Sequence, residues 1–467
     1  MTSNKGVDGI VEILIAPLGS GGYEEKGVGM REYRTAKYKF PDSGKIYETS
    51  FITAAISEHL KVDKIILVGT KNSMWEEVYR YFGKIEGDLE KEKKYFSLIE
   101  KIGDQLTEVD LQCVNEVMDE FLKNINPHAS GGSVCKILEY GMNDEELFKN
   151  LDIFMDLQQQ FQPADKIYLD ITHSFRSIPL FMYLMIDFIQ TLRKDIIRLS
   201  GIYYGMFEVS RELDYTPIID LNPLFSITKW TKGVFDFVTY GNVDLMAELM
   251  EDNDIKQTML NISKLTNLNY IRELRSQMDK LRYQLEKVDD VPVPQSMLLY
   301  LKPELLDFVN YFKGVNNDAE FQFRLAKWFF DHNRYANGYI CLAESIITYL
   351  QYIYKKRIPS IDYQNKNDRK KIQDLLLHFL KNDSNKDYQK IGQVYDEIRI
   401  IRNHIAHAGF GDHDDYDKVI KKSLELANTV EKYIFHNSNE TKLSKLPSLY
   451  DFNNLRKRPN FQKESSR

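Results

Sequence analysis

Cysteine is scarce in this sequence, since its 467 residues include only Cys113, Cys135 and Cys341. These three lie far apart, are odd in number and lack the paired spacing of zinc ligands. The sequence also lacks a histidine-carboxylate cluster with metal-ligand spacing and a locally supported Ser-His-Asp arrangement. We therefore expect no metal or other cofactor and no covalent nucleophile, and a reducing, cytoplasmic location is the simplest interpretation.

Long apolar runs and an excess of positive charge are missing as well. No window approaches the roughly 20 apolar residues needed to cross a bilayer, and no basic stretch followed by an apolar run opens the chain. We expect neither membrane insertion nor export. The net charge is -7, so no global positive field attracts nucleic acid, and a polyanion must bind at a local basic or amide-lined site. This argues against a protein that wraps or specifically reads duplex DNA.

Core-forming residues, in contrast, are plentiful. Hydrophobic residues make up 43% and charged residues 28% of the chain, which is typical of a globular protein. A chain of 467 residues is too long for one ordinary core, and we expect roughly two or three domains. At least two functions could therefore be joined.

Strand and helix patterns alternate through the first half of the chain. Helices are expected at about 49–60, 73–82, up to 124 and 144–161, between strands at 11–16, 64–69, 109–114, 166–171 and 199–204. Such alternation is typical of a parallel sheet covered by helices. Residues 1–228 are therefore predicted to form a Rossmann-like α/β domain.

From about residue 229 the strand signals fade and amphipathic helical patterns take over. Helices are predicted over 267–287, 323–350 and 391–407, with a polar loop over 355–371. Pro292, Pro294 and Pro303 punctuate a connector. We divide this half into an all-α connector (229–318), an all-α domain (319–442) and a solvated basic tail (443–467).

The first candidate site follows the first predicted strand. Gly19, Ser20, Gly21 and Gly22 form a glycine-dense loop. Small residues let backbone N–H groups approach an anion closely, and such an amide nest needs no net charge. The loop matches neither the dinucleotide fingerprint nor a P-loop, and a plain turn explains it equally well.

The second candidate segment, 170–176, leaves a buried strand and enters an apolar helix. Thr172, His173, Ser174 and Arg176 place hydroxyls, an imidazole and a guanidinium beside helix N-terminal amides. This combination suits a phosphate or a nucleobase. In the alternative interpretation, Thr172 and Ser174 only cap the helix and Arg176 pairs with a surface carboxylate.

The segment Asp170-Ile171-Thr172-His173-Ser174-Phe175-Arg176 resembles the D-x-T-H-G-F-R signature of CRISPR-associated CARF-domain proteins of type III systems, with Ser174 in place of the glycine. The loop after the first strand is similar too. The resemblance implies that a pocket made by two CARF domains binds cyclic oligoadenylate, with cyclic tetra-adenylate as the expected activator. Its binding residues would be Gly19, Ser20, Gly21, Gly22, Thr172, His173, Ser174 and Arg176.

The last predicted helix, 391–407, carries the third candidate site. Its apolar stripe consists of Ile391, Val394, Tyr395, Ile398, Ile401 and Ile405. Arg402 falls inside this stripe, and a buried guanidinium needs an anionic or carbonyl partner. On an ideal helix, Arg402 and His407 lie about 140° apart. Either the helix loosens near Gly409, or two copies of the chain bring their segments together.

The hexapeptide Arg402-Asn403-His404-Ile405-Ala406-His407 resembles the Arg-x4-His motif of HEPN ribonucleases. The resemblance implies a metal-independent site built by a homodimer or larger assembly, which cuts single-stranded RNA to 2′,3′-cyclic phosphate ends. Arg402 would stabilise the phosphate, His407 would manage protons or position the 2′-OH, and Asn403 would orient them. We expect His404 to be structural and Glu344 to be solvated rather than paired with Arg402.

Three functions remain open at this point. The chain could be an endoribonuclease switched on by cyclic oligoadenylate. It could be a ligand-responsive regulator that does not cut. It could also be a ring nuclease that degrades its activator in the CARF pocket.

Overall fold

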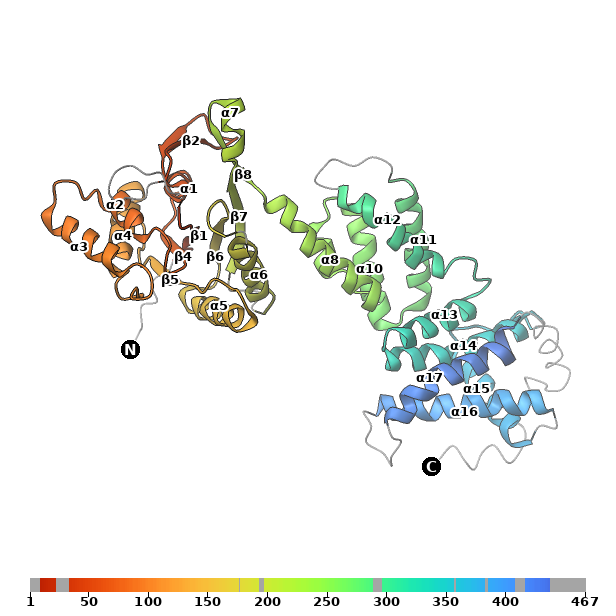
Figure 1. The fold of residues 1–467 in the computed structure, drawn as a ribbon. Helices are drawn as coiled ribbons and strands as arrows, with labels where there is room; N and C mark the ends of the chain where they lie inside the picture. The colour runs from red at the N-terminus through yellow and green to blue at the C-terminus, as the bar shows by residue number, and fades with distance from the viewer. Residues whose placement is uncertain are drawn as a thin grey trace, which may run out of the picture. The chain divides into compact units, whose positions relative to one another are not determined.

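The computed structural model describes residues 9–21, 33–175, 177–192, 197–288, 296–356, 358–382, 385–407 and 416–436. The chain divides into two compact units, Met1–Phe225 and Ser226–Arg467 (Figure 1). The first is built around a sheet and the second from helices. Among the described helices, none is long and apolar enough to cross a membrane.

An eight-stranded sheet forms the centre of the first unit, in the order β3-β2-β8-β7-β6-β1-β4-β5. Strands β5, β4, β1, β6 and β7 run parallel, whereas β8 is antiparallel to β7 and β3 is antiparallel to β2. The strands are β1 (Glu12–Leu18), β2 (Ala36–Lys39), β3 (Ile46–Thr49), β4 (Lys64–Gly69), β5 (Val134–Ile137), β6 (Asp165–Asp170), β7 (Ile197–Gly205) and β8 (Thr216–Asp220). The predicted parallel sheet is confirmed in its centre, and the strands that extend it beyond β7 were not predicted.

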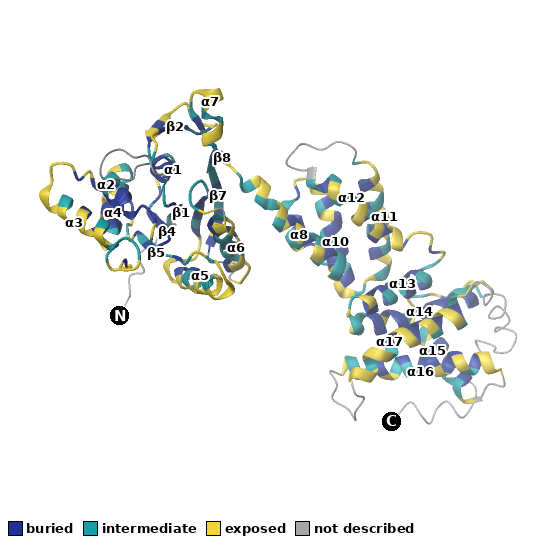
Figure 2. Cartoon of the chain, viewed as in Figure 1, coloured by how far each residue is buried: buried dark blue, intermediate teal, exposed yellow. Residues whose placement is uncertain are grey.

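Helices cover both faces of this sheet (Figure 1). They are α1 (Ile52–Leu60), α2 (Trp75–Gly83), α3 (Leu89–Lys101), α4 (Gln112–Ile125), α5 (Asp144–Leu157), α6 (Ser177–Leu192) and the short α7 (Ser210–Leu213). Leu14 packs with α1 to α4, whereas its neighbours Ile13 and Ile15 pack with α5 and α6 on the other face. Strands buried on both sides explain the continuous apolar runs of the sequence (Figure 2).

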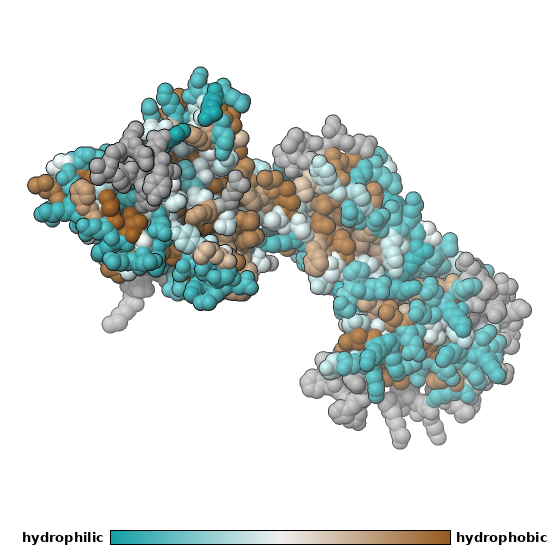
Figure 3. Space-filling view, viewed as in Figure 1, coloured by the Kyte–Doolittle hydropathy of each residue, from teal (hydrophilic) through white to brown (hydrophobic). Residues whose placement is uncertain are grey.

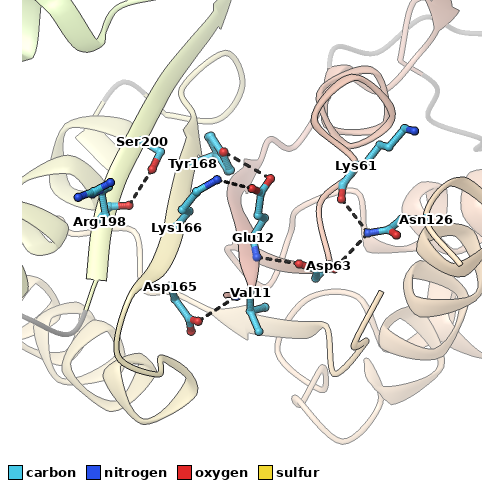
Figure 4. A network of polar contacts seen from close by, with 10 residues as sticks. All are labelled: Val11, Glu12, Lys61, Asp63, Asn126, Asp165, Lys166, Tyr168, Arg198 and Ser200. Atoms are coloured by element: carbon cyan, nitrogen blue, oxygen red, sulfur yellow. Dashed lines mark hydrogen bonds and ion pairs between the residues drawn. The ribbon is translucent and has the colours of Figure 1, made fainter. Parts of the chain in front are cut away.

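Polar bonds join the strands at the amino ends of β1 and β6 (Figure 4). The N–H groups of Val11 and Glu12 donate to the carboxylates of Asp165 (3.2 Å) and Asp63 (2.8 Å). The Glu12 carboxylate accepts a bond of 2.7 Å from Lys166. At the amino ends of these strands, the protein's own side chains therefore bond the polar groups. In sheets of this kind, ligands bind at the carboxyl ends of the strands.

The second unit is helical, as predicted. Its helices are α8 (Asn222–Tyr240), which begins in the first unit, α9 (Asp244–Leu249), α10 (Asn253–Leu268), α11 (Ile271–Glu286), α12 (Ser296–Tyr311), α13 (Asp318–Asp331), α14 (Tyr335–Lys355), α15 (Lys366–Asn382), α16 (Lys386–Ala406) and α17 (Tyr416–Val430), followed by a π-helical turn at Glu431–Phe435. One hydrophobic cluster extends from Trp230 to Ile434. The connector helices therefore share a core with the helices that follow them.

The strand predicted at 109–114 is wrong. Residues 108–111 form a turn and α4 begins at Gln112. The buried positions of this segment have helical spacing: Leu111, Val114, Val117, Met118 and Leu122. The strand that pairs with β4 on the side away from β1 is the four-residue β5, which is too short to produce a clear period.

Several predicted helix boundaries are also wrong. The helices predicted over 267–287 and 323–350 are interrupted, because Asn269 (φ 55°) and Asn333 (φ 58°) adopt the left-handed conformation. Helix α15 begins inside the predicted loop 355–371, and Pro303 lies within α12. Pro292, Pro294 and the tail 443–467 lie outside the described residues.

Candidate functional site

The end of β6 positions the segment 170–176. Asp170 is fully buried, and its carboxylate accepts bonds from the Thr172 N–H (2.9 Å) and the Thr53 hydroxyl (3.3 Å). The Thr172 hydroxyl accepts a bond of 3.0 Å from the Gly205 N–H at the end of β7. Thr172 therefore fixes the segment to the neighbouring strand, which differs from the capping role considered from the sequence.

Ser174 has a backbone φ of +83°, in the region that favours glycine. It occupies the position where the CARF signature has glycine, so the chain keeps a glycine-like backbone with a serine side chain. The buried Ser174 hydroxyl has no hydrogen-bond partner among the described residues.

The glycine loop contacts this segment although the two are far apart in sequence. A Cβ atom on Gly19 would lie 3.2 Å from the Ser174 amide nitrogen and 3.3 Å from the Tyr33 hydroxyl. The Gly19 carbonyl accepts bonds of 3.0 Å from the Tyr33 hydroxyl and the Met74 N–H. Only glycine permits this approach without displacement. The structure thus brings two of the three candidate sites together at the carboxyl ends of β1 and β6.

Of the other candidate binding residues, the structure describes Gly21 but neither Gly22 nor Arg176. Gly21 has φ +72°, and a Cβ atom there would overlap the Met74 side chain.

The His173 ring lies beside Tyr33, with centroids 5.2 Å apart, and its buried Nε2 has no hydrogen-bond partner among the described residues. Burial lowers the pKa of His173, although the nearby Asp170 carboxylate opposes the shift. The imidazole is therefore neutral at pH 7. A neutral ring can accept or donate one hydrogen bond at this nitrogen.

An apolar surface begins where this segment ends. Leu180, Leu184, Phe188 and Leu192 recur every four residues along α6 and are 44–58% exposed. Tyr140, Leu147 and α6 border a cavity of about 200 Å³, and the Tyr140 ring contacts Phe175. Hydrophobic residues show at the surface over α6 in the space-filling view (Figure 3). Monomeric proteins seldom expose a contiguous apolar stripe of this kind to water.

Helix α16 carries the third candidate site. Ile391, Val394, Tyr395, Ile398 and Ile401 are buried, as the apolar period predicted, and Ile405 is half-buried. The helix is continuous through Ala406, and His407 caps it by donating its N–H to the Asn403 carbonyl (2.9 Å). Within one chain, Arg402 and His407 therefore stay on different sides of a regular helix. Gly409 lies outside the described residues.

The three candidate residues differ in exposure. Arg402 and Asn403 are half-buried, and His407 is exposed. The Nε atom of Arg402 is buried without a hydrogen-bond partner, and no carboxylate among the described residues pairs with this side chain. The guanidinium expected to be buried is therefore only partly buried, and of the anionic or carbonyl partner expected for it, no carboxylate is found in the described part of the chain.

Glu344 differs from the expectation of a solvated glutamate. It pairs with Arg369 and its side chain is 30% exposed. Sequence reasoning missed Arg369 because it lay in the predicted loop 355–371. The apolar spacing of Ile372, Leu375, Leu376 and Phe379 is the signal that could have placed it on a helix. Among the described residues, no group of three His, Cys, Asp or Glu side chains is positioned to hold a metal ion.

Comparisons with known proteins match both units. Residues 13–208 match the CARF domain of the CRISPR system endoribonuclease Csx1, and residues 226–317 match the second domain of the CRISPR-associated protein MJ1674. The MJ1674 protein of Methanocaldococcus jannaschii is 41% identical over 412 residues, which are 85% of this chain and 62% of that protein. The chain thus spans less than two thirds of the length of this relative.

A solved structure of Enterococcus italicus Csm6 bound to cyclic hexa-2′-fluoro-hexa-dAMP also aligns with the chain. The identity is 13% and the TM-score 0.39, over 95% of this chain and 100% of that one. At this level of similarity, nothing about the present chain follows from it.

The matched residues agree with the sheet and with the two segments that meet at its carboxyl edge. The first unit is therefore a CARF domain, and the helical unit after it begins with a region similar to the second domain of MJ1674.

Proposed function

We propose that the chain is a metal-independent, single-stranded RNA endoribonuclease of type III CRISPR defence, activated by cyclic oligoadenylate. The observation that carries the proposal is Arg402, a half-buried cation without a carboxylate partner among the described residues, on a helix that ends at His407. Such a cation is suited to the charge that develops on a phosphate during cleavage. The same chain contains a CARF domain, which in this proposal binds the activator and controls cleavage.

The proposed activator pocket consists of Gly19, Ser20, Gly21, Gly22, Thr172, His173, Ser174 and Arg176. The close approach of Gly19 to Ser174 supports this grouping. The Ser174 hydroxyl, without a partner in the described part of the chain, and the neutral His173 imidazole offer hydrogen bonds to a ligand that carries bases as well as phosphates. We expect cyclic tetra-adenylate to be the activator.

The proposed division of labour follows the chain. Residues 1–228 sense the activator, 229–318 connect, 319–442 form a HEPN-like ribonuclease domain, and 443–467 form a basic tail. If the activator binds the cleaving arrangement of these domains more tightly than the resting arrangement, it shifts the population toward the cleaving one.

A second copy of this chain is the proposed occupant of the α6 stripe. The stripe begins directly after the segment 170–176, so covering it would bring two activator-binding segments close together. The regular helix around Arg402 supports the same conclusion, because one chain alone does not bring His407 beside it. A homodimer would supply Arg402 and His407 twice.

The proposed reaction consumes no water. The 2′ oxygen of one ribose forms a bond to the adjacent phosphorus, and the bond from phosphorus to the 5′ oxygen of the next nucleotide breaks. A proton leaves the 2′-OH and a proton is delivered to the departing 5′ oxygen, which yields a 2′,3′-cyclic phosphate and a 5′-OH. His407 manages these protons, Arg402 stabilises the phosphate charge and Asn403 orients the groups.

A fluorescent RNA reporter tests the proposal. Wild-type protein is incubated in EDTA with cyclic tri-, tetra- or hexa-adenylate, and the RNA ends are identified. We expect cleavage only with an activator, cyclic phosphate ends, and a loss of at least roughly 100-fold for Arg402→Ala and His407→Ala. If Arg402→Ala with His407→Ala cuts as the wild type does, the site is elsewhere.

A ring nuclease is the second candidate. It is favoured by the neutral His173 next to the Ser174 hydroxyl, which no described residue bonds. The same incubation decides between them, because linear adenylate products without RNA cleavage indicate a ring nuclease. Activator binding without either product indicates a regulator that does not cut.

A further inference from the structure

The positive charges of three arginines act on the Tyr395 hydroxyl in the second unit. Arg399 and Arg402 belong to α16, as does Tyr395, and Arg369 lies in the first turn of α15. Burial raises the pKa of this hydroxyl to about 12, although all three positive charges act to lower it. The hydroxyl is buried and has no hydrogen-bond partner among the described residues. It remains a neutral donor at any physiological pH.

The carboxylates beside these arginines do not balance them. Asp396 accepts bonds from the Nε of Arg399 (3.0 Å) and its terminal nitrogen (2.7 Å). Glu344, on α14, pairs with Arg369. Arg402 has no carboxylate partner among the described residues. The three arginines therefore have two carboxylate partners among the described residues, and one positive charge is left without a partner.

Arg369 and Arg402 lie on helices that pack against each other. Helices α14, α15 and α16 are mutual neighbours, and Gly392 of α16 approaches the backbone of Leu376 and Leu380 on α15. Burial lowers the pKa of Arg369, and the positive charge of Arg402 lowers it further. Two like charges that are half-buried side by side are unfavourable unless an anion lies between them. The ion pair with Glu344 uses one terminal nitrogen of Arg369, and a guanidinium has five N–H donors, so donors remain for a second acceptor.

We propose that Arg369 is a second phosphate-binding residue of the ribonuclease site, held beside Arg402 by its ion pair with Glu344. The inference rests on the proposed function, because the anion would be a phosphate of the bound RNA. Two guanidiniums can donate to different oxygens of one phosphate, which fixes its orientation as well as its charge. Glu344 is then a positioning residue.

The experiment uses the full chain with cyclic tri-, tetra- and hexa-adenylate. The variants are Arg369→Ala, Arg369→Lys and Glu344→Gln, and the matched control is Lys370→Ala. Lys370 is exposed on the same helix, one residue further and so turned by about 100°. Single-turnover cleavage is measured, and RNA binding is measured against salt concentration in a His407→Ala background.

We expect Arg369→Ala to cut roughly 10- to 100-fold more slowly, which is the usual effect of losing a charge-assisted hydrogen bond. The slope of log affinity against log salt should fall by about 0.7, the contribution of one phosphate contact on a single strand. Arg369→Lys should retain the slope but not the rate, because lysine cannot donate as a planar fork. Lys370→Ala should change neither quantity.

Glu344→Gln keeps the Arg369 charge but weakens the interaction that orients it. A positioning role therefore predicts an unchanged salt slope with a slower cleavage step. A purely structural role would instead lower the thermal stability of Arg369→Ala and Glu344→Gln and leave the slope at its wild-type value.

Wild-type rate and slope in a folded Arg369→Ala protein would overturn the inference. Where that variant does not fold, Arg369→Lys decides: a wild-type rate would count against Arg369. If the wild type itself cuts no RNA, the proposed function fails, and the salt slope of RNA binding still shows whether Arg369 contacts a phosphate.

Discussion

Replacing Ser174 by glycine should stabilise the CARF domain, because two unfavourable features meet at this residue. Its left-handed backbone costs about 1–2 kcal/mol for a residue with a Cβ atom. Its buried hydroxyl, which has no hydrogen-bond partner among the described residues, costs about 1 kcal/mol more. Glycine removes both, but its greater freedom in the unfolded chain offsets about 0.5–1 kcal/mol. The net gain expected for Ser174→Gly is about 1–2.5 kcal/mol.

Ser174→Ala separates the two contributions, because it removes the hydroxyl and keeps the Cβ atom. We expect it to gain about 1 kcal/mol at most. Scanning calorimetry of the full chain measures both variants, and 1 kcal/mol corresponds to roughly 2–4 °C in a unit of this size. Lys84→Gly is a positive control, since Lys84 caps α2 with φ 46° and is exposed. It should gain about 0.5–1 kcal/mol without affecting the ligand.

The result that would refute the backbone argument is a Ser174→Gly protein no more stable than Ser174→Ala. Titration calorimetry with cyclic tetra-adenylate adds the functional half. If the hydroxyl is kept for the activator, both variants should bind it roughly fivefold more weakly, as expected for one lost hydrogen bond. Unchanged affinity would mean that the hydroxyl does not contact this ligand.

Three further perturbations test other parts of the molecule. Gly392→Ala would place a Cβ atom 2.8 Å from the Leu376 carbonyl oxygen on α15, so the unfolding free energy of the helical unit should fall by about 1–3 kcal/mol; an unchanged transition would mean that the helices separate easily. Leu184→Asp puts a charge in the α6 stripe and should weaken the proposed dimer in analytical ultracentrifugation, whereas a dimer of undiminished affinity would place the interface elsewhere. His173 has a folded-state pKa below its ordinary 6.5, so the unfolded chain takes up its proton first and stability should fall as the pH drops below about 6.5. His173→Gln should weaken that dependence between pH 7 and 5, and parallel curves for the two proteins would contradict the assignment.

The centre of the sheet could be predicted because each of its strands is buried on both faces. Apolar runs such as Lys64–Gly69 have no other simple explanation. The edge strands could not be predicted, since β2, β3 and β5 have only four residues each and show no measurable period. Helix breaks at Asn269 and Asn333 were missed because the apolar stripe continues past each break, and one left-handed residue leaves little trace in a hydrophobic pattern.

The site was predictable where chemistry is local in sequence and unpredictable where it depends on packing. The polar types of Thr172, His173 and Ser174 indicated a binding segment, but only the fold shows that the Thr172 hydroxyl bonds to β7. Arg369 reaches Glu344 across two helices, and no spacing rule relates such residues. Helix geometry predicted that Arg402 lies within the buried stripe. That no carboxylate of the described residues pairs with it is a property of the tertiary structure, which the sequence does not show.

The contact between Gly19 and the Ser174 amide has a consequence for motion. Two loops whose backbones touch cannot move apart independently, because the displacement of one exposes the other. Their amide hydrogens should therefore exchange with solvent as one cooperative unit, although the loops are far apart in sequence. A ligand that contacts only one loop would slow exchange in both, and the whole carboxyl edge of β1 and β6 would respond as a single element.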